Sequence, residues 1–485
     1  MTEGVQKVIR ADNSRESLIE LKNSLRGDNA HLAWDDVDYL ITLLRLPDPK
    51  SRKNVAQILG IAKVQKAADP LLQALKAEEV EYVKSAYLIA LKSINIDQLR
   101  GRLSELRDEL SRKQITDENK KHIDEQMNAY NDLLGAEIAK HKFVGGGIPS
   151  EVVLITQKGL SQFTADSLYS STKKVLSIGV CAKINSYDEV KHVRTYKEML
   201  YIVPGLKKTS ADPYEAAADF ANGTLKKFLD ERHKEEAPWG YRVNLISRMD
   251  DKNKNLFIKR FAGELYRLSG GYFVNAPSNY EMEFRMFENK EGKLTVLVKL
   301  NTINDTRFDY RKDVVAASIR PELAATLIKL SADYLKSNIQ VLDPFCGVGT
   351  MLIERAKYRN VFPIFGVDTF GEAITKARSN AEAANVDINF IQRDYFDFKS
   401  NSPFDEIITN MPFATKDEDR AKIDEIYRKF FDYSKKMLKK GAYIIMYVRD
   451  INAAREYSKK YGYFLEKEVL ISDNENSYLC IYRKK

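Results

Sequence analysis

Cysteine and histidine are scarce in this sequence and are scattered along it. The 485 residues include three cysteines, Cys181, Cys346 and Cys480, and no two of them form a C-x-x-C pair. The five histidines show no H-x-x-x-H spacing either. These absences argue against a disulfide framework and against a structural zinc site, so we expect no metal centre. They are typical of a reducing compartment, and we expect a cytoplasmic location.

Long apolar runs are also missing. A run such as Ala442–Val448 is far too short to span a membrane. The opening segment MTEGVQKVIRADNSR has no apolar core of the kind that a signal peptide carries. We therefore expect a soluble protein without a membrane partner. With 44% hydrophobic residues and a length beyond the usual limit of about 250–300 residues for a single core, the chain should form more than one domain.

Neither sign of charge dominates the composition. The chain has 77 Lys and Arg residues against 69 Asp and Glu residues, which gives a net charge of +8. This modest basic excess is compatible with a polyanionic partner such as a nucleic acid. A surface with scattered lysines explains it equally well.

Residues 1–142 show no strand patterns, and glycine is rare among them. Apolar residues recur at helical spacing, for example between residues 37 and 44, which predicts a nearly all-α region. Residues 51–60 are echoed by residues 83–92, and the pattern resembles helical repeats of the HEAT type. Such an array usually offers a docking surface to a protein partner. A plain helical cap on the next domain is the alternative.

The pattern changes after a linker marked by Gly145–Gly147. Short strands and helices are mixed within residues 150–305, which predicts an α+β region. Its later part resembles the THUMP domain of RNA-modifying enzymes, and its earlier part resembles the ferredoxin-like segment that commonly precedes that domain. For a single lysine here an idle surface charge is the simpler explanation, but for the whole basic cluster we favour RNA. The side chains that would contact phosphates are Lys252, Lys254, Lys259, Arg260 and Arg267.

A short apolar run, residues 339–342, ends at Asp343 and is followed by the glycine turn C-G-V-G-T at residues 346–350. An amphipathic segment comes next. Strand, tight turn and helix in this order open a doubly wound α/β sheet, in which ligands bind at the carboxyl ends of the strands. Three further strands end at Asp368, Asp394 and Asn410. We therefore predict a Rossmann-like α/β fold with a binding site at these strand ends.

This set of motifs resembles the class I S-adenosyl-L-methionine-dependent methyltransferases, in the branch whose N-P-P-[FY] motif methylates exocyclic or amide nitrogens. The resemblance implies that the glycine turn holds the methionine end of the cofactor, that Asp368 binds the ribose and that Asp394 contacts the adenine. The cofactor-binding residues that it implies in this chain are Ser318, Pro321, Asp343, Phe345, Cys346, Gly347, Gly349, Thr350, Asp368 and Asp394.

A segment before the first of these strands makes the resemblance more specific. It contains R-F-D-Y-R from Arg307 and then S-I-R-P-E-L-A-A from Ser318. In RNA methyltransferases of this branch, a comparable segment lies just before the cofactor motif and closes over the methionine end of the cofactor. Pro321 also suits the first turn of a helix. The resemblance covers the chain from about residue 151 onward.

The Asn-x-Pro-Phe motif permits methylation of an exocyclic amine, which is a poor nucleophile because its lone pair is delocalised into the ring. The side-chain oxygen of Asn410 and the backbone carbonyl of Met411 would accept both N–H bonds and orient the lone pair, so that positioning carries most of the rate. Pro412 would hold the turn, and Phe413 would stack on a flipped base. Two residues depart from the motif: Met411 stands where proline is usual, and Ala414 where glycine often follows.

Three functions are consistent with these features. The first is methylation of the N2 amine of guanosine in RNA, with tRNA favoured as the substrate; the choice of guanine rests on the resemblance alone. The second is N6-adenine methylation of RNA or DNA, because the same acceptors suit the amine of adenine. The third is a weakly active cofactor-binding scaffold whose helical array docks a partner. We predict three domains: a HEAT-like region at 1–142, a ferredoxin-like and THUMP-like region at 150–305, and a methyltransferase domain at 306–485.

Overall fold

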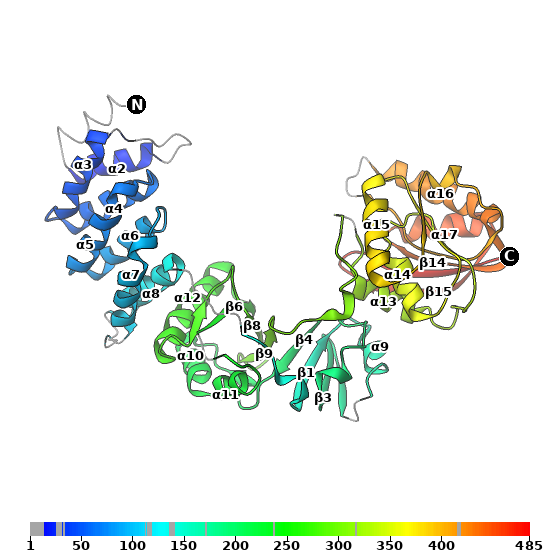
Figure 1. Cartoon of the computed structure of the whole chain (residues 1–485), viewed down its shortest axis with the longest axis horizontal. Helices are drawn as coiled ribbons and strands as arrows, with labels where there is room; N and C mark the ends of the chain where they lie inside the picture. Colours follow the sequence, from blue (N-terminus) through cyan, green and yellow to red (C-terminus); the bar gives the residue numbers. More distant parts are fainter. Residues whose placement is uncertain are drawn as a thin grey trace. The chain divides into compact units, whose positions relative to one another are not determined.

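The computed structural model describes residues 14–25, 32, 34–111, 113, 119–134, 141–169, 172–235, 238–315, 318–414 and 419–485. Its elements are labelled in Figure 1. The chain forms two compact units, and each is built from two segments. One unit comprises Met1–Gly145 and Ile202–Ile303, and the other comprises Gly146–Tyr201 and Asn304–Lys485. The predicted region 150–305 thus contributes to both units, and the division into three domains stays a prediction.

Every element that the structure describes between residues 14 and 134 is a helix (Figure 1). Local signals start them: Asp48 accepts a hydrogen bond from the backbone N–H of Ser51, and Pro49 occupies the first turn. Their apolar faces meet in one core. The helices are α2 (Arg15–Ser24), α3 (Trp34–Thr42), η1 (Leu43–Arg45), α4 (Pro49–Ile61), η2 (Gln65–Ala67), α5 (Ala68–Ala77), α6 (Glu81–Leu91), η3 (Asp97–Leu99), α7 (Arg100–Ser111) and α8 (Lys120–Leu134).

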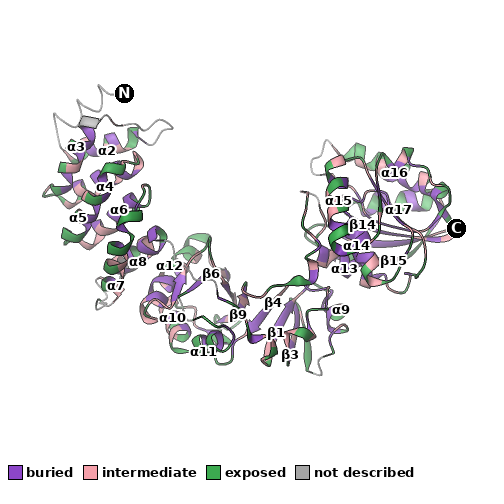
Figure 2. Cartoon of the chain, viewed as in Figure 1, coloured by how far each residue is buried: buried purple, intermediate pink, exposed green. Residues whose placement is uncertain are grey.

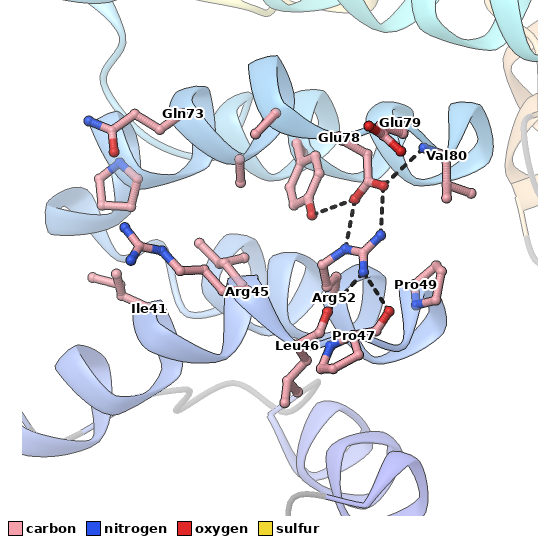
Figure 3. A pocket seen from close by; sticks show the side chains of 15 residues that line it. Ile41, Arg45, Leu46, Pro47, Pro49, Arg52, Gln73, Glu78, Glu79 and Val80 are labelled. Atoms are coloured by element: carbon pink, nitrogen blue, oxygen red, sulfur yellow. Dashed lines mark hydrogen bonds and ion pairs between the residues drawn. The ribbon is translucent and has the colours of Figure 1, made fainter.

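A largely buried ion pair joins three of these helices and lies in the wall of a pocket between them (Figure 3). Arg52 of α4 donates two hydrogen bonds, 2.8 and 2.7 Å long, to the carboxylate of Glu78 at the end of α5. Tyr87 of α6 donates its hydroxyl to the same carboxylate at 3.1 Å. Burial raises the pKa of Glu78, but the hydrogen bonds from Arg52 and other donors outweigh it, so the pKa lies below its ordinary value.

The second segment of this unit contains a mixed sheet of strand order β9-β8-β6-β7, in which β5 pairs with β9. Aromatic side chains pack its helices together and onto the sheet: the ring of Phe220 lies 5.1 Å from that of Phe261 and 4.7 Å from that of Phe284. The elements are β5 (Lys208–Thr209), α10 (Pro213–Asn222), α11 (Leu225–Asp230), β6 (Trp239–Ile246), α12 (Asp251–Leu268), β7 (Phe273–Asn275), β8 (Met282–Glu288) and β9 (Leu294–Leu300).

The helical segment and this sheet share one apolar core. Tyr266 of α12 and Val274 of β7 belong to the same buried cluster as the apolar residues of α2–α8. The side chain of Asn128 in α8 also donates to the backbone carbonyl of Lys259 in α12, at 3.2 Å. One side of α12 is therefore covered by the preceding helices.

In the other unit, the segment before residue 202 forms a sheet of order β2-β3-β1-β4, with β3 antiparallel to both β1 and β2. Figure 2 shows buried residues along its strands. Its elements are η4 (Gly145–Gly147), β1 (Ser150–Ile155), α9 (Ser161–Ala165), β2 (Lys173–Leu176), β3 (Gly179–Ile184), η5 (Tyr187–Glu189) and β4 (Glu198–Ile202).

The segment from Asn304 forms a seven-stranded sheet of order β12-β11-β10-β13-β14-β16-β15. Strands β10 to β14 run parallel, and β16 is antiparallel to β14 and β15. The elements are η6 (Thr306–Phe308), α13 (Pro321–Leu330), β10 (Val341–Asp343), α14 (Thr350–Tyr358), β11 (Ile364–Asp368), α15 (Gly371–Ala384), β12 (Asn389–Gln392), η7 (Tyr395–Asp397), β13 (Phe404–Asn410), α16 (Arg420–Met437), β14 (Leu438–Val448), α17 (Ile451–Lys460), β15 (Tyr463–Ser472) and β16 (Ser477–Lys484).

Helices cover both faces of this sheet. Side chains of α13, α14 and α15 belong to one apolar core and those of α16 and α17 to another. Successive residues of β14 alternate between them, since Ile445 lies in the first core and Ile444 and Met446 in the second. This arrangement confirms the predicted Rossmann-like α/β fold. The antiparallel hairpin β15–β16 is an addition that the sequence patterns above do not predict.

A buried clasp holds the two segments of this unit together. Arg194, which precedes β4, donates two hydrogen bonds of 2.8 and 2.7 Å to the carboxylate of Glu354 in α14. Tyr310 donates its hydroxyl to Glu354 at 2.7 Å, and Arg307 donates to the carbonyl of Tyr196 at 2.8 Å. Because α14 begins at the glycine turn, the clasp anchors the element that carries the predicted site.

Candidate active site

The glycine turn between β10 and α14 has the backbone shape that its sequence predicts. Gly347 and Gly349 have φ values of +51° and +80°, in the left-handed region that favours glycine. A Cβ atom at Gly349 would lie 2.9 Å from Cζ of Phe390, whereas one at Gly347 would meet no described heavy atom within 4 Å. The turn is anchored by the N–H of Cys346, which donates to the carbonyl of Val367 at 3.0 Å.

Asp368 lies at the end of β11, beside the turn. Its Oδ2 accepts a hydrogen bond from the N–H of Gly347 at 2.8 Å, and its Oδ1 accepts one from the N–H of Phe370 at 2.9 Å. The side chain is half-buried. A carboxylate has about four acceptor positions, so two remain for the hydroxyls of a ligand.

Asp343 ends β10 and is 1% exposed. Burial raises the pKa of its carboxyl from 3.8 to about 7, and the negative charge of Asp368 acts in the same direction. The hydrogen bond from the N–H of Phe345, 3.0 Å long, opposes this shift without cancelling it. The carboxyl therefore loses its proton near neutral pH in the absence of a ligand. A cationic ligand group next to it would stabilise the ionised form.

The Asn-Met-Pro-Phe motif continues from the end of β13. The backbone N–H of Met411 donates to the carbonyl of Tyr447 in β14 at 3.0 Å, and the side chain of Met411 is 1% exposed within an apolar core. Proline has no N–H and could not make this hydrogen bond. Met411 therefore ties the turn to the sheet by a bond that the usual proline lacks. Within the part of the chain that the structure describes, the side chain of Asn410 makes no hydrogen bond and is free to bind a ligand.

One pocket of about 370 Å³ collects most of the predicted site. Ser318, Asp343, Phe345, Cys346, Gly347, Thr350, Asp368, Asn410, Met411, Pro412 and Phe413 all line it. The sequence reasoning missed Val315, Ile319, Val348, Met351, Thr369, Phe370 and Ala373, which also line it. Phe370, half-exposed and two residues beyond Asp368, could have been noted from its position after a carboxylate predicted to bind the ribose.

Three predicted residues do not line the pocket. Gly349 is the N-cap residue of α14, and Pro321 is buried at the first turn of α13. Asp394 is exposed, and its side chain accepts a hydrogen bond from the N–H of Phe396 at 2.9 Å, which caps η7. Its contact with adenine stays a prediction.

The pocket fits the predicted cofactor in its polar groups and in its shape. The hydroxyl of Thr350, at the start of α14, is buried and has no hydrogen-bond partner among the described residues. Because buried polar groups are usually hydrogen-bonded, this hydroxyl is available to bind a ligand. The open space at Gly347 allows a ligand to approach the backbone closely. The carboxylates of Asp343 and Asp368 can serve the amine and the hydroxyls of such a ligand.

The five basic residues predicted to contact RNA lie on α12, in the other unit. Lys252 and Lys259 are exposed, and Arg260 is half-buried. The ammonium of Lys254 lies 3.8 Å from the carboxylate of Asp251. Arg267 is held in a bidentate ion pair by Glu264 on the same helix, so Lys252 and Lys259 are the more available cations.

The described residues were compared with the requirements of a metal site and of a membrane helix. Among the described residues, no group of three or more His, Cys, Asp or Glu side chains could hold a metal ion. In the same part of the chain, no helix combines the length and the apolar character needed to cross a membrane.

Comparisons with known proteins find similarity in the C-terminal part of the chain. Residues 309–464 match the family described as "RMKL-like, methyltransferase domain". Over 156 residues the chain is 30% identical to the tRNA (guanine(10)-N2)-dimethyltransferase of Methanothermobacter thermautotrophicus, a match that covers 32% of this chain and 45% of that protein. The chain thus spans less than half of this relative.

Solved structures with a similar fold include TrmN from Thermus thermophilus, with a TM-score of 0.53 and 16% identity over 69% of this chain and 99% of that chain. Another is SMU.472 complexed with SAH, with a TM-score of 0.50 and 15% identity over 70% of this chain and 98% of that chain. At these identities the likeness shows the fold. The family match and the similarity to the tRNA dimethyltransferase make S-adenosyl-L-methionine the cofactor of this domain.

Proposed function

We propose that this protein is an S-adenosyl-L-methionine-dependent RNA methyltransferase that acts on the exocyclic N2 amine of a guanosine, with tRNA as its substrate. The observation that carries the proposal is the free Asn410 side chain, which lines the same pocket as Asp368 and Gly347. An amide without a partner among the described residues, next to a cofactor site, is suited to bind the group that receives the methyl. The similarity to a tRNA guanine-N2 dimethyltransferase supports the choice of base and of RNA.

When bound, the cofactor supplies an electrophilic methyl group on its sulfonium. Asp343 and the glycine turn would hold its methionine end, Asp368 its ribose and Asp394 its adenine. Ser318, which lines the pocket, would close over the methionine end.

The side-chain oxygen of Asn410 and the carbonyl of Met411 would accept the two N–H bonds of the target amine and direct its lone pair toward the methyl group. As the nitrogen gains the methyl, it releases one proton to water. Phe413 would stack on the flipped base. The hydrogen bond from Met411 to Tyr447 supports an intact acceptor turn and weakens the scaffold alternative.

The regions outside the sheet have proposed roles of their own. The ferredoxin-like and THUMP-like region would bind RNA, and on α12 the exposed Lys252 and Lys259 would contact its phosphates. Helices α2–α8 would form a HEAT-like array that docks a protein partner. We also propose that the protein acts in the cytoplasm.

Methyl transfer from labelled S-adenosyl-L-methionine to unmodified bulk tRNA, followed by nucleoside analysis, tests the proposal. Label in N2-methylguanosine is the expected result, and the control variant Asn410→Ala should incorporate it about 10²–10³-fold more slowly. Label in N6-methyladenosine would show that the target base is adenine and not guanine, because the amine of adenine suits the same two acceptors. If the cofactor binds and neither tRNA nor ribosomal RNA is methylated, the proposed methyltransferase function is replaced by that of a cofactor-binding scaffold.

A further inference from the structure

Phe413 is the aromatic residue of the acceptor turn, and an arginine covers one of its faces. The guanidinium carbon of Arg449 lies 3.9 Å from the centre of the Phe413 ring. Phe413 lines the cofactor pocket, whereas Arg449 does not. The guanidinium therefore lies over one face of a ring that borders the pocket.

Arg449 is held in this position by a second residue. Its Nη2 lies 3.2 Å from Oε2 of Glu475, which belongs to the turn between β15 and β16. The hydroxyl of Tyr447 donates to the same oxygen at 3.3 Å. Tyr447 is also the residue whose carbonyl accepts the N–H of Met411. A closed chain of contacts thus runs from Met411 through Tyr447, Glu475 and Arg449 to Phe413.

We propose that Arg449 is a positioning residue for the target base. Held by Glu475, it fixes the plane of the Phe413 ring, so that the other face of the ring presents the stacked base to Asn410. The planar guanidinium is suited to this role because it stacks on an aromatic face while it keeps its hydrogen bonds in plane. A cation on one face also withdraws electron density from the ring, which favours an electron-rich purine on the other face. The inference rests on the proposed methyl transfer.

Steady-state methylation of bulk tRNA by variants of Arg449 tests the inference. Arg449→Ala should lower kcat about tenfold to thirtyfold. The KM for tRNA should change less than about threefold, because phosphate contacts dominate RNA affinity. Affinity for S-adenosyl-L-methionine should stay unchanged, since Arg449 does not touch the pocket. Glu475→Gln should lower kcat by a smaller factor, because it loosens Arg449 without removing it.

Arg449→Lys distinguishes stacking from charge. Lysine keeps the positive charge but loses the planar group, so its kcat should stay close to that of Arg449→Ala. Recovery of the wild-type rate with lysine, or a raised KM with a weaker salt dependence, would show a phosphate contact instead and overturn the inference.

A matched control lies on the neighbouring strands. Arg483 pairs with Glu466 at 2.5 Å, and its guanidinium carbon lies 5.2 Å from the ring of Phe464, but none of these residues lines the pocket. Arg483→Ala should leave kcat and KM unchanged. A wild-type protein that methylates no RNA would refute the proposed function and this inference with it, whereas wild-type activity that Arg449→Ala preserves would refute the inference alone.

Discussion

The carboxylate of Asp368 accepts a hydrogen bond from the backbone N–H of Gly347, with 2.8 Å between oxygen and nitrogen. This bond joins the end of β11 to the turn that follows β10. The carboxylate predicted to bind the ribose and the glycine turn, which come from separate stretches of sequence, are therefore one structural unit. Asn410 lines the same pocket from the end of β13, so the proposed roles of cofactor binding and amine positioning fall to different residues and can be tested separately.

Asp368→Ala should weaken the affinity for S-adenosyl-L-methionine about tenfold to a hundredfold, because it removes charge-assisted hydrogen bonds to the ribose and the support of Gly347. The rate at saturating cofactor should fall much less. Calorimetric titration of the cofactor, together with kcat, measures both effects. A loss of kcat with unchanged affinity would show that Asp368 does not bind the cofactor.

Asn410→Ala should lower the rate of methyl transfer far more than the affinity for the cofactor. We expect kcat to fall about 10²–10³-fold, the usual result of removing one preorganised hydrogen-bonding group from an active site. Cofactor affinity should stay within about threefold of the wild-type value, and the same titration and rate measurements apply. Equal losses of cofactor affinity in this variant and in Asp368→Ala would mean that the two roles are misassigned.

Gly349→Ala should mainly lower the stability of the fold, whereas Gly347→Ala should mainly lower the affinity for the cofactor. At Gly349 the new Cβ would lie 2.9 Å from the ring of Phe390 with φ at +80°, so we expect a loss of about 1–3 kcal/mol in the free energy of unfolding. At Gly347 the space is open, so the fold should lose less and the cofactor affinity more. Urea unfolding and cofactor titration of both variants test this contrast, and equal destabilisation would contradict it.

Asp343 should make stability depend on pH. The folded chain holds the proton of this carboxyl up to about pH 7, whereas the unfolded chain loses it near the ordinary pKa of 3.8. Its stabilising contribution is therefore full below pH 3.8 and is lost as the pH rises to about 7, at up to about 1.4 kcal/mol per pH unit.

The measurement is urea unfolding without cofactor between pH 5 and pH 8, compared with Asp343→Asn. The variant has no carboxyl to titrate, so its stability should fall less over this range than that of the wild type. Parallel curves for the two proteins would show that Asp343 is ionised in the fold.

Glu354→Gln should destabilise the unit that contains the pocket. The change removes the negative charge from a side chain that is 1% exposed, and leaves Arg194 without its counter-ion. We expect a loss of about 2–4 kcal/mol in the free energy of unfolding. Glu468→Gln is the matched control, because Glu468 forms a similar pair with Arg455 at the surface. A similar result for both variants would show that the clasp contributes no more than a surface pair.

Much of the site could be predicted from the sequence because the residues concerned act locally. A carboxylate at the end of a strand, or a glycine at a position of positive φ, can be recognised from a pattern of a few consecutive residues. Asp343, Asp368, Gly347 and Asn410 were identified in this way, and the structure brings all four to one pocket. Asp394 shows the same local pattern, yet it is exposed outside the pocket lining, because its surroundings depend on how the following turn folds.

The sequence by itself determined the α/β alternation from Asn304 onward, the order of the strand-end residues and the chemistry that they permit. Only the tertiary structure decided what surrounds them. Examples are the bond from Met411 to Tyr447, the cover of Arg449 over Phe413 and the buried clasp at Glu354. These contacts join residues of different elements, and their partners are set by sheet register and helix packing rather than by neighbours in the chain.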